Sequence, residues 1–565
     1  MTWKKRGNAR NITEVIQESS SLKLKEIAFP ADIPPSLIVG IDEAAEMISQ
    51  GVKDRMKITI VGDYDADGIT ASAILWFLLR YLGTSPTIRL PKRYTEGYGM
   101  SDRIVEEIKE GLILTVDNGI SAIEEIKKAK TKGLTVIVLD HHLAGDTLPP
   151  ADILVDPHIA PNENAFSDYC GAGLAFKLVQ SLVDDEEFIK RMSALAAIGT
   201  VADVVPLVGD NRIIVKNGLA CINRRELPVG LLALLRAAGY ETVDEQTLGF
   251  VFGPLLNAAG RLLDDGAMLS LEVLISEKYE EAEKKAYELI KLNQQRKRLQ
   301  KEGMTRAYEL LEKEERIQAP ICIYDPNLLT GIAGLVAGKL SEEFQVPAFV
   351  LTKANEEGLL KGSGRSYGGI HLKELLDKAN IYLESYGGHE GAAGVSIRQD
   401  VFQDFKSVLE KELCAYKTND NGILFYDLEV HPEDISAIVE DLERYAPYGS
   451  GNPRPIIRVD NIIPLPTGGK VFRTMGENNE HIRMTAKGVS IVAFNKAQEF
   501  NTLGDIGSIN VVGYLSKSSY MGNIRVELEV LDFTGNCVQN HNSVLQQRLL
   551  NRCKTIDKIA TGGEE

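Results

Sequence analysis

The side chains best suited to chemistry in this chain are carboxylates and imidazoles that stand directly after apolar runs. They are Asp63, Asp65, Asp67, Asp117, Asp140, His141, His142 and Asp203. Continuous runs of Val, Ile and Leu are typical of parallel strands that are buried on both faces. The carboxyl ends of such strands meet at one edge of an open α/β sheet, where ligands bind. Oxygen and imidazole ligands gathered there would suit a divalent metal ion, Mg²⁺ or Mn²⁺.

Three of the acids stand close together on alternate positions. Asp63, Asp65 and Asp67 lie at a predicted strand-to-helix turn. Carboxylates this close repel one another unless a cation lies among them. An alternative is that they only cap the following helix, because acids are favoured near a helix N-terminus. Three further apolar runs, the last at 194–202, are also expected to be strands. Acids or histidines follow each of these runs, which favours the metal site. Two ions about 4 Å apart can activate water and stabilise a displacement at phosphorus.

The composition restricts the class of protein. At 565 residues the chain is long enough for three or four domains of ~150 residues. It has no apolar stretch long enough to cross a bilayer, and no apolar segment follows the basic N-terminus, so we expect neither a membrane span nor a secretory signal. The six cysteines form no CxxC pair, which is typical of a reducing cytosol and argues against a cysteine zinc site. The net charge of -17 argues against non-specific coating of DNA, but an enzyme with a local basic groove remains compatible with it.

Strands and helices alternate through the region that holds the acids. The apolar runs 58–61, 112–116 and 135–139 predict strands, and the segments 69–82 and 121–130 predict helices. Repeated strand–helix units of this kind build a parallel sheet. The sequence therefore predicts an α/β domain that brings the acids to one edge of its sheet.

The rest of the chain shows three further patterns. Residues 211–270 are expected to be mostly helical, and the charged stretch 271–317 predicts one long helix. The simplest interpretation of that helix is a solvated connection, and the alternative is that it also lines a nucleic-acid path. A second α/β region follows, beginning with a strand at 321–324. Five short strands at 455–535 suggest a small barrel of the OB type.

Several polar residues close to glycines form a second group of candidates. They are Arg93, Tyr98, Arg261, Ser363, Arg365 and His389. A guanidinium gives bidentate contacts to phosphate, an aromatic ring stacks on a base, and a glycine lets the backbone approach an anion. The alternatives are a charged surface loop around Arg93, a tight turn at His389 and a packing role for Arg261.

Four segments together resemble the motifs of a known superfamily. They are Val61–Gly68, Val116–Ile120, Leu139–His142 and Gly199–Leu207. They are similar to the four motifs of the DHH phosphoesterase superfamily, in the version of the RecJ single-strand-specific exonucleases. The resemblance continues through Asn257–Arg261, while Gly362–Ser366 and Gly387–Gly394 resemble a DHHA1 domain.

The resemblance implies a metal ligand set. Asp65, Asp117, His141 and Asp203 would hold one Mn²⁺ or Mg²⁺. Asp63 and Asp117 would hold a second ion, so that Asp117 bridges the two. A carboxylate between two cations is the simplest such bridge.

The resemblance also implies catalytic and substrate contacts. Asp67 would support the site as a catalytic residue, and His142 would contact the scissile phosphate. The substrate residues would be Arg93, Ser363 and Arg365 at the 5′ phosphate, Arg261 and His389 at other phosphates, and Tyr98 stacked on a base.

The implied activity is that of a metal-dependent exonuclease. It would degrade single-stranded DNA from the 5′ end to 5′ mononucleotides, in DNA repair, recombination or phage DNA metabolism. The alternatives are a phosphodiesterase of short oligonucleotides or cyclic dinucleotides and a non-catalytic replication scaffold. We expect single-stranded DNA as the partner, a helicase or a single-strand-binding protein as recruiting proteins, no membrane contact, and a cytoplasmic monomer.

The expected fold is α/β, with a parallel-sheet DHH domain, a long connecting helix, an α/β DHHA1 domain and a C-terminal OB-like β-barrel. The predicted segments are a lead-in at 1–55, the DHH domain at 56–270, the connecting helix at 271–317, the DHHA1 domain at 318–417, a linker with a helix at 418–454, the OB-like nucleic-acid-binding domain at 455–535 and a tail at 536–565.

Overall fold

The computed structural model divides the chain into two compact units. It describes residues 2–20, 32–159, 166–314, 318–354, 356–413, 423–466, 471–476, 478–502, 506–520 and 523–537. The larger unit spans 29–420, and the smaller unit joins 1–28 to 421–565. Residues 418–422 of the predicted linker and 538–565 of the predicted tail lie outside the described residues. None of the described helices is both long and apolar enough to cross a membrane.

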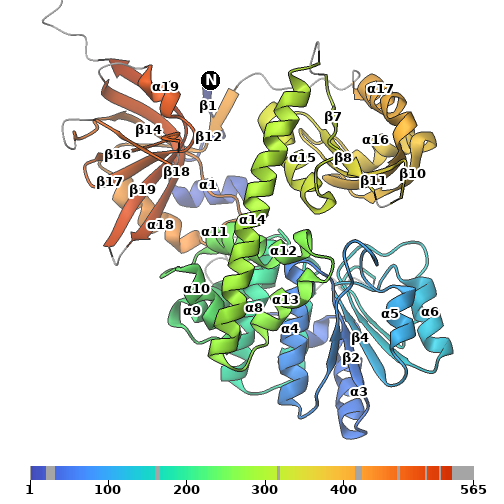
Figure 1. The fold of residues 1–565 in the computed structure, drawn as a ribbon. Helices are drawn as coiled ribbons and strands as arrows, with labels where there is room; N and C mark the ends of the chain where they lie inside the picture. The colour runs from blue at the N-terminus through green and yellow to red at the C-terminus, as the bar shows by residue number, and fades with distance from the viewer. Residues whose placement is uncertain are drawn as a thin grey trace, which may run out of the picture. The chain divides into compact units, whose positions relative to one another are not determined.

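The first half of the larger unit is built on a parallel five-stranded sheet (Figure 1). Its strands run in the order β3 (Thr87–Arg89), β2 (Ile58–Val61), β4 (Leu112–Val116), β5 (Thr135–Leu139) and β6 (Ile153–Val155). The three apolar runs predicted as strands are β2, β4 and β5, and these predictions are confirmed. Every residue of β2 and β4 is buried, which explains their unbroken apolar sequence.

Helices pack around this sheet and form a helical region after it. They are α3 (Ile41–Lys53), α4 (Ala66–Tyr81), α5 (Asp102–Glu107), α6 (Ile123–Thr131), α7 (Gly171–Leu182), α8 (Glu186–Ala202), α9 (Gly209–Arg224), α10 (Val229–Ala238), α12 (Gly253–Leu262) and α13 (Gly266–Leu274), with the short turns η1 (Pro35–Leu37), α11 (Glu245–Thr247) and η2 (Leu248–Phe252). The mostly helical character predicted for 211–270 is confirmed. The helix predicted at 69–82 is α4, which begins earlier because the Asp65 side chain caps it.

The apolar run 194–202 is helical, so the prediction of a strand there is wrong. The run forms the C-terminal half of α8, and its residues Ala194–Thr200 are all buried. The helix packs against α4, α7 and α9, so it meets apolar neighbours on several sides. A helix buried on several sides shows no clear helical period, and its alanines favour a helix over a strand. Asp203 therefore follows a helix, as the C-cap of α8.

The long charged helix is α14 (Tyr279–Leu311), which begins later than predicted because 266–274 form the separate helix α13. It is more than a solvated connection. Ala282, Ala286 and Leu289 are buried where α14 packs on α10, α12 and α13. Near its other end, Met304, Ala307 and Leu311 belong to the core of the second half of the unit. In Figure 1, α14 runs from one half of the larger unit to the other.

The second half of the larger unit is built on a mixed five-stranded sheet. Its order is β10 (Leu383–Gly388), β11 (Ala392–Arg398), β9 (Leu359–Arg365), β8 (Ala348–Lys353) and β7 (Ile321–Tyr324). Its helices are α15 (Thr330–Phe344), α16 (Leu372–Lys378) and α17 (Phe402–Leu413), with the short turns η3 (Asn380–Tyr382) and η4 (Gln399–Val401). Only β7 and β8 are parallel, and the other pairs are antiparallel. The predicted strand at 321–324 is confirmed as β7.

The smaller unit is a seven-stranded sheet with two short helices against it. Its order is β13 (Leu428–Val430), β14 (Ile457–Ile462), β18 (Ile506–Tyr520), β19 (Asn523–Cys537), β17 (Val489–Ala493), β16 (His481–Ala486) and β15 (Arg473–Met475). The helices are α18 (Ile435–Tyr445) and α19 (Ala497–Asn501). The five predicted strands are present, but β18 and β19 form a hairpin that is longer than predicted.

Two predicted boundaries differ from the structure. The predicted linker at 418–454 contains β12 (Ile423–Tyr426), β13 and α18, which belong to the smaller unit. The predicted lead-in at 1–55 is split between the units, because β1 (Thr2–Lys5) pairs in parallel with β12, and α1 (Ile12–Ser19) packs on α18. Such pairing between distant segments leaves no local signal in the sequence.

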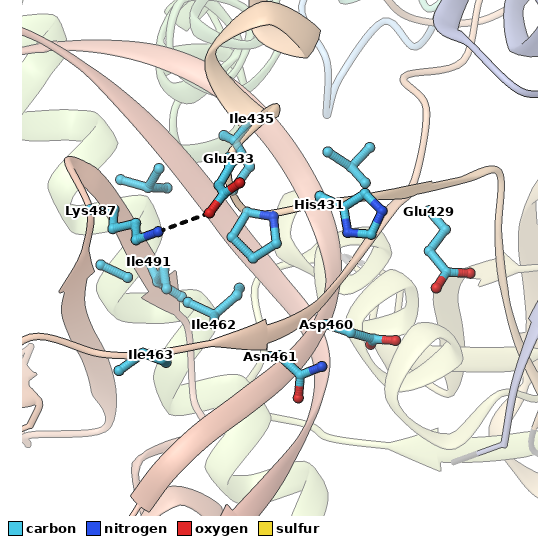
Figure 2. Close-up of a pocket in the computed structure, with 14 residues that line it drawn as sticks. Glu429, His431, Glu433, Ile435, Asp460, Asn461, Ile462, Ile463, Lys487 and Ile491 are labelled. Carbon is cyan, nitrogen blue, oxygen red and sulfur yellow. Dashed lines mark hydrogen bonds and ion pairs between the residues drawn. The ribbon is translucent and has the colours of Figure 1, made fainter.

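The smaller unit also contains a hollow of 460 Å³ beside β13, β14 and β17 (Figure 2). Glu429, Glu433 and Asp460 line it together with several isoleucines. The Lys487 Nζ lies 3.3 Å from the Glu433 Oε1, so one of these acids is paired. His431 and Asn461 are the other polar residues of the lining, which is therefore of mixed polarity.

Candidate metal centre and phosphate site

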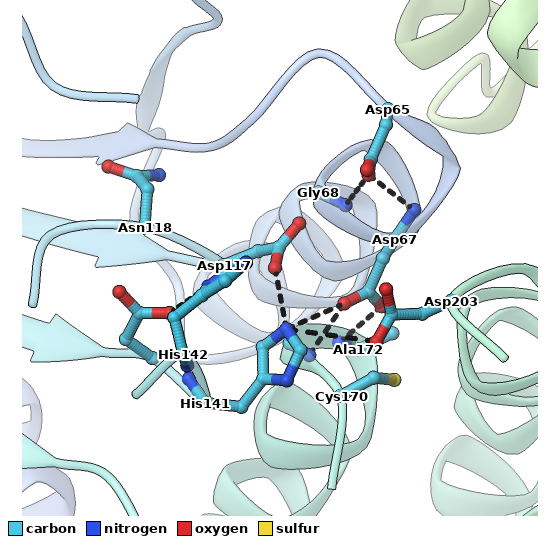
Figure 3. A network of polar contacts seen from close by, with 12 residues as sticks. Asp65, Asp67, Gly68, Asp117, Asn118, His141, His142, Cys170, Ala172 and Asp203 are labelled. Carbon is cyan, nitrogen blue, oxygen red and sulfur yellow. Dashed lines mark hydrogen bonds and ion pairs between the residues drawn. The ribbon is translucent and has the colours of Figure 1, made fainter. Parts of the chain in front are cut away.

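The predicted acids and histidine meet at the carboxyl edge of the parallel sheet (Figure 3). Asp117 directly follows β4, and His141 follows β5 by two residues. The His141 Nε2 lies 3.1 Å from Asp117 Oδ1 and 3.8 Å from an oxygen of each of Asp67 and Asp203. The sheet thus brings together side chains from four separate segments, as the sequence predicted.

Three overlapping groups of ligand atoms each lie within 4.8 Å of one another. They are Asp67, His141 and Asp203; Asp63, Asp65 and Asp117; and Asp117, His141 and His142. The predicted assignment put Asp65 beside His141 and Asp203. The structure instead brings Asp67 beside these two residues and Asp65 beside Asp63, so the prediction is corrected at this point.

Backbone N–H groups fix the two carboxylates that differ from the prediction. One oxygen of Asp65 accepts from the N–H groups of Asp67 at 3.0 Å and Gly68 at 3.1 Å, so this residue is also the cap of α4. Asp67 accepts from the N–H groups of Gly171 at 2.6 Å and Ala172 at 2.9 Å, at the start of α7. Helix capping and metal binding are therefore compatible, since each carboxylate oxygen has two lone pairs.

The backbone of Asp117 has φ = +60°, a left-handed conformation that is uncommon for residues other than glycine. The Tyr98 hydroxyl donates to the Asp117 carbonyl at 3.0 Å. A Cβ on Gly171 would lie 2.5 Å from the Asp117 Cβ, so only a glycine lets α7 approach this closely. Non-glycine residues held in rare backbone conformations cluster at functional sites.

Asp140 organises the two histidines, a role that the sequence analysis did not assign. Its Oδ1 accepts from the His141 N–H at 2.8 Å, the His142 N–H at 3.3 Å and the His142 Nδ1 at 2.8 Å. Its Oδ2 accepts from the Ile120 N–H at 2.9 Å. The sequence does indicate this role indirectly, because Asp140 stands between an apolar strand and the two histidines.

The electrostatics of the site favour a bound cation. Burial, together with the neighbouring acids, raises the pKa values of Asp63 and Asp117 well above their usual range. The same causes raise the pKa of Asp203 to about 8. Asp63 Oδ1 is buried and has no hydrogen-bond partner among the described residues. Burial lowers the pKa of His141, which keeps its imidazole neutral and able to bind a metal. These ligands fit Mg²⁺ or Mn²⁺.

His142 has the opposite character from His141. Burial disfavours its charged form, but the hydrogen bond and the charge of Asp140 outweigh this and raise the pKa of His142 to about 9. Its ring is 5.7 Å from the ring of Tyr98, edge to face. Tyr98 itself is 47% exposed, so its ring remains accessible to a ligand although its hydroxyl is bound.

The predicted arginines gather beside the acids. Burial and the neighbouring charges of Arg93, Arg296 and Arg365 lower the pKa of Arg261 to about 10. Burial and Arg93 likewise lower the pKa of Arg365. Arg93, Arg261 and Arg365 form no ion pair with a carboxylate among the described residues. Positive groups that lower one another's pKa and have no anionic partner are suited to bind phosphate.

Ser363 and Arg365 lie together on β9, facing α15. A Cβ added to Gly334 of α15 would lie 2.9 Å from an Arg365 guanidinium nitrogen and 3.3 Å from the Ser363 hydroxyl. The Arg261 Nη1 donates to the Gly331 carbonyl at 3.3 Å, one turn earlier in α15. The helix α15 thus brings the three predicted phosphate residues close together.

His389 is more peripheral than the other predicted phosphate residues. It is exposed at the turn between β10 and β11, where its N–H donates to the Ala392 carbonyl at 2.9 Å. Register places Ala392 opposite Arg365, so the turn lies at the same end of the sheet as that arginine. No described contact joins the His389 imidazole to the arginines.

Comparison with known proteins identifies the family. Residues 57–200 match the DHH family, N-terminal domain, residues 318–414 match the DHHA1 domain and residues 426–532 match the RecJ OB domain. The chain is 31% identical to the single-stranded-DNA-specific exonuclease RecJ of Haemophilus influenzae, over 89% of this chain and 89% of that protein. The chain belongs to the RecJ family.

Other RecJ proteins and structures agree. The RecJ of Bacillus subtilis is 34% identical over 88% of this chain, which spans 64% of that protein, slightly less than two thirds. The crystal structure of RecJ in complex with Mn²⁺ from Thermus thermophilus has a TM-score of 0.76 at 30% identity, covering 92% of this chain and 75% of that one. A further RecJ structure is described with Mg²⁺. Both predicted metals therefore occur with relatives of this chain.

Proposed function

We propose that this RecJ-family chain is a metal-dependent exonuclease that removes 5′ mononucleotides from single-stranded DNA, starting at the 5′ end. The supporting observation is the presence of two complementary sites in one unit. One is the buried group of carboxylates with an imidazole. The other is the group of arginines beside it, which have no carboxylate partner among the described residues. The first site suits divalent cations and the second suits phosphate.

The ligand groups suggest how two ions would be held. Asp67, Asp117, His141 and Asp203 would hold one Mn²⁺ or Mg²⁺, and Asp63, Asp65 and Asp117 would hold the other. Asp117 contributes to both groups and would be the bridge. When bound, such a pair of ions activates a water molecule and neutralises charge at phosphorus. The protein holds the ligands in place through the N–H groups that bind Asp65 and Asp67.

His142 would contact an oxygen of the scissile phosphate. Its Nδ1 is held by Asp140, and the Nε2 N–H of the charged imidazole, which lies 3.2 Å from the Tyr98 hydroxyl oxygen, would be the donor. A positioned donor of this kind stabilises negative charge that develops on a phosphoryl oxygen. Asp140 would be a positioning residue, because its described hydrogen bonds go to the His142 ring and to backbone N–H groups.

Arg93, Ser363 and Arg365 would bind the 5′ phosphate, and this contact would set the direction of degradation. The charge of Arg93 partly offsets the rise that burial and neighbouring acids cause in the pKa values of Asp63 and Asp65, so this charge lies near the metal ligands. A strand whose terminal phosphate is bound there would present its first internal phosphodiester to the metal centre. Arg261 and His389 would contact further phosphates, and the accessible ring of Tyr98 would stack on a base.

The smaller unit would guide the single strand. We further propose a cytoplasmic enzyme that acts as a monomer and is recruited by a helicase or a single-strand-binding protein. A pull-down with each candidate protein tests the recruitment, and sedimentation tests the monomeric state.

The test is degradation of a single strand labelled at either end, with Mn²⁺ and with EDTA. Immediate release of a labelled mononucleotide from the 5′ end, absent with EDTA and with a duplex, is expected. Asp117→Asn is the matched inactive variant, because asparagine tolerates the left-handed backbone at this position. Cleavage of dinucleotides alone would instead indicate a phosphodiesterase of short substrates. An intact 5′ label with release from the 3′ end would refute the proposed direction.

A further inference from the structure

A cationic cavity lies next to the proposed 5′-phosphate site in the larger unit. It has a volume of 540 Å³, within the usual size range of small-molecule sites. Arg93 lines it, so the cavity shares a residue with the phosphate site. We propose that this cavity receives additional phosphates attached to the 5′-terminal phosphate, so that the enzyme also accepts single strands with a 5′ triphosphate. This inference rests on the proposed function and extends its substrate class.

Strand β9 connects the phosphate site to the cavity. Successive side chains of a strand point to opposite faces, so Lys361, Ser363 and Arg365 share one face of β9 at intervals of about 7 Å. Ser363 and Arg365 are the proposed 5′-phosphate ligands, and Lys361 lines the cavity. One interval along the strand is comparable with the length of a triphosphate chain. A phosphate chain that starts at Ser363 can therefore reach Lys361.

The charge of the cavity matches this ligand. Arg93, Lys353 and Lys361 line it, against the single acid Glu356. Lys353 pairs with Leu360, so its side chain points to the opposite face of the sheet, and Arg93 and Lys361 provide the charge on the side of the phosphate site. Both lysines are exposed and form no ion pair among the described residues. This local excess of positive charge is notable in a chain with a net charge of -17. A compact group of cations without anionic partners favours a polyphosphate.

The other lining residues disfavour a nucleobase. Leu262, Leu328 and Leu359 provide an apolar wall but no partner for the polar edges of a base. The one aromatic residue, Tyr94, uses its hydroxyl to donate to the Arg261 carbonyl. The start of α15 adds the positive end of a helix dipole at Thr330, where no side chain caps the helix. The cavity therefore suits a short anionic chain better than a second nucleotide.

The reaction on such a substrate would be an ordinary hydrolysis. The oxygen of water forms a bond to the phosphorus of the first internal phosphodiester, and the bond from that phosphorus to the 3′ oxygen of the first nucleotide breaks. One proton of the water goes to the 3′ oxygen and the other to solvent. The products are a nucleoside 5′-triphosphate and a strand shortened by one nucleotide that ends in a 5′ monophosphate. Later turnovers would release monophosphates.

The test uses the full chain with Mn²⁺ and single strands that carry either a 5′ monophosphate or a 5′ triphosphate labelled at its last phosphate. We expect the label to appear in a nucleoside triphosphate. Lys361→Glu should lower kcat/KM for the triphosphate strand about tenfold and change that for the monophosphate strand by less than about twofold. Lys361→Arg should retain the triphosphate activity. Lys411→Glu, on α17, is the control for charge reversal at an exposed lysine.

Each other outcome is informative. Label released as phosphate or pyrophosphate, or an intact triphosphate strand beside a degraded monophosphate strand, would overturn the inference alone. Equal loss of activity on both strands in Lys361→Glu would also overturn it. Failure to degrade the monophosphate strand would overturn the proposed function itself.

Discussion

Replacing Asp140 by asparagine should slow catalysis while leaving the metal centre in place. The carboxylate accepts four hydrogen bonds, three at Oδ1 and one at Oδ2. An amide has one acceptor oxygen, and its NH₂ group would face an N–H donor at the other position. At least one buried donor therefore loses its partner, which costs about 1–3 kcal/mol. If about 2 kcal/mol of this appears as lost alignment of His142, kcat falls about 30-fold.

The assay is single-turnover cleavage of a 5′-phosphorylated strand at saturating Mn²⁺, with the Mn²⁺ affinity measured separately by calorimetry. We expect a lower rate with Mn²⁺ affinity unchanged within about threefold, because Asp140 contributes no ligand atom to the groups around the ions. An unchanged rate would refute the assigned role of Asp140. A parallel loss of Mn²⁺ affinity would show that Asp140 instead maintains the ligand geometry of His141.

Three further predictions concern stability and metal binding. Gly171→Ala should weaken Mn²⁺ binding by about tenfold or more in calorimetry, because the new methyl group would lie 2.5 Å from the Asp117 Cβ. The control Gly338→Ala should leave Mn²⁺ binding unchanged, because no atom lies closer than 3.8 Å to its new methyl group. Removing divalent ions with EDTA should lower the melting temperature more at pH 8.5 than at pH 6. Carboxyl groups whose pKa is raised in the folded state, such as Asp203 at about 8, destabilise the folded state as pH rises through that range. An equal fall in melting temperature at both pH values would contradict this. Lys177→Met should lower the free energy of unfolding of the larger unit by about 3–5 kcal/mol, because Lys177 is fully buried with its Nζ 2.9 Å from Asp210 Oδ2. Adding Asp210→Asn to the Lys177→Met chain should recover part of this loss in chemical unfolding.

The parallel sheet and the meeting of the acids were predictable because both follow from local patterns. β2, β4 and β5 are short apolar runs, and an acid follows each of them within two residues. Asp203 lies 3.8 Å from the His141 Nε2 even though the run before it is helical. What the sequence could not show was α8 itself, because a run buried on several sides has neither a period of 2 nor one of 3.6.

Contacts between segments that are distant in the sequence were the second feature that the sequence did not predict. Nothing local predicts that β1 pairs with β12, or that residues near the N-terminus belong with the smaller unit. The meeting of Arg93, Arg261 and Arg365 is of the same kind. The helix α15 brings Arg261 and Arg365 together, and the Arg93 N–H donates to the Asp264 carbonyl just after α12. Their clustering could be inferred only from the resemblance, and the cavity beside them could not be inferred at all.

The division of the aspartates between the two ligand groups shows most clearly where the sequence pattern fails. In a strand, Asp63, Asp65 and Asp67 would share one face, because side chains alternate with a period of two. Asp65 still has an extended backbone, with φ -93° and ψ -179°, and the chain becomes helical at Ala66, where α4 begins. Asp67 therefore follows the helical period and turns toward His141 and Asp203, while Asp65 stays with Asp63. The N–H groups of Gly171 and Ala172 that bind Asp67 hold this arrangement in place.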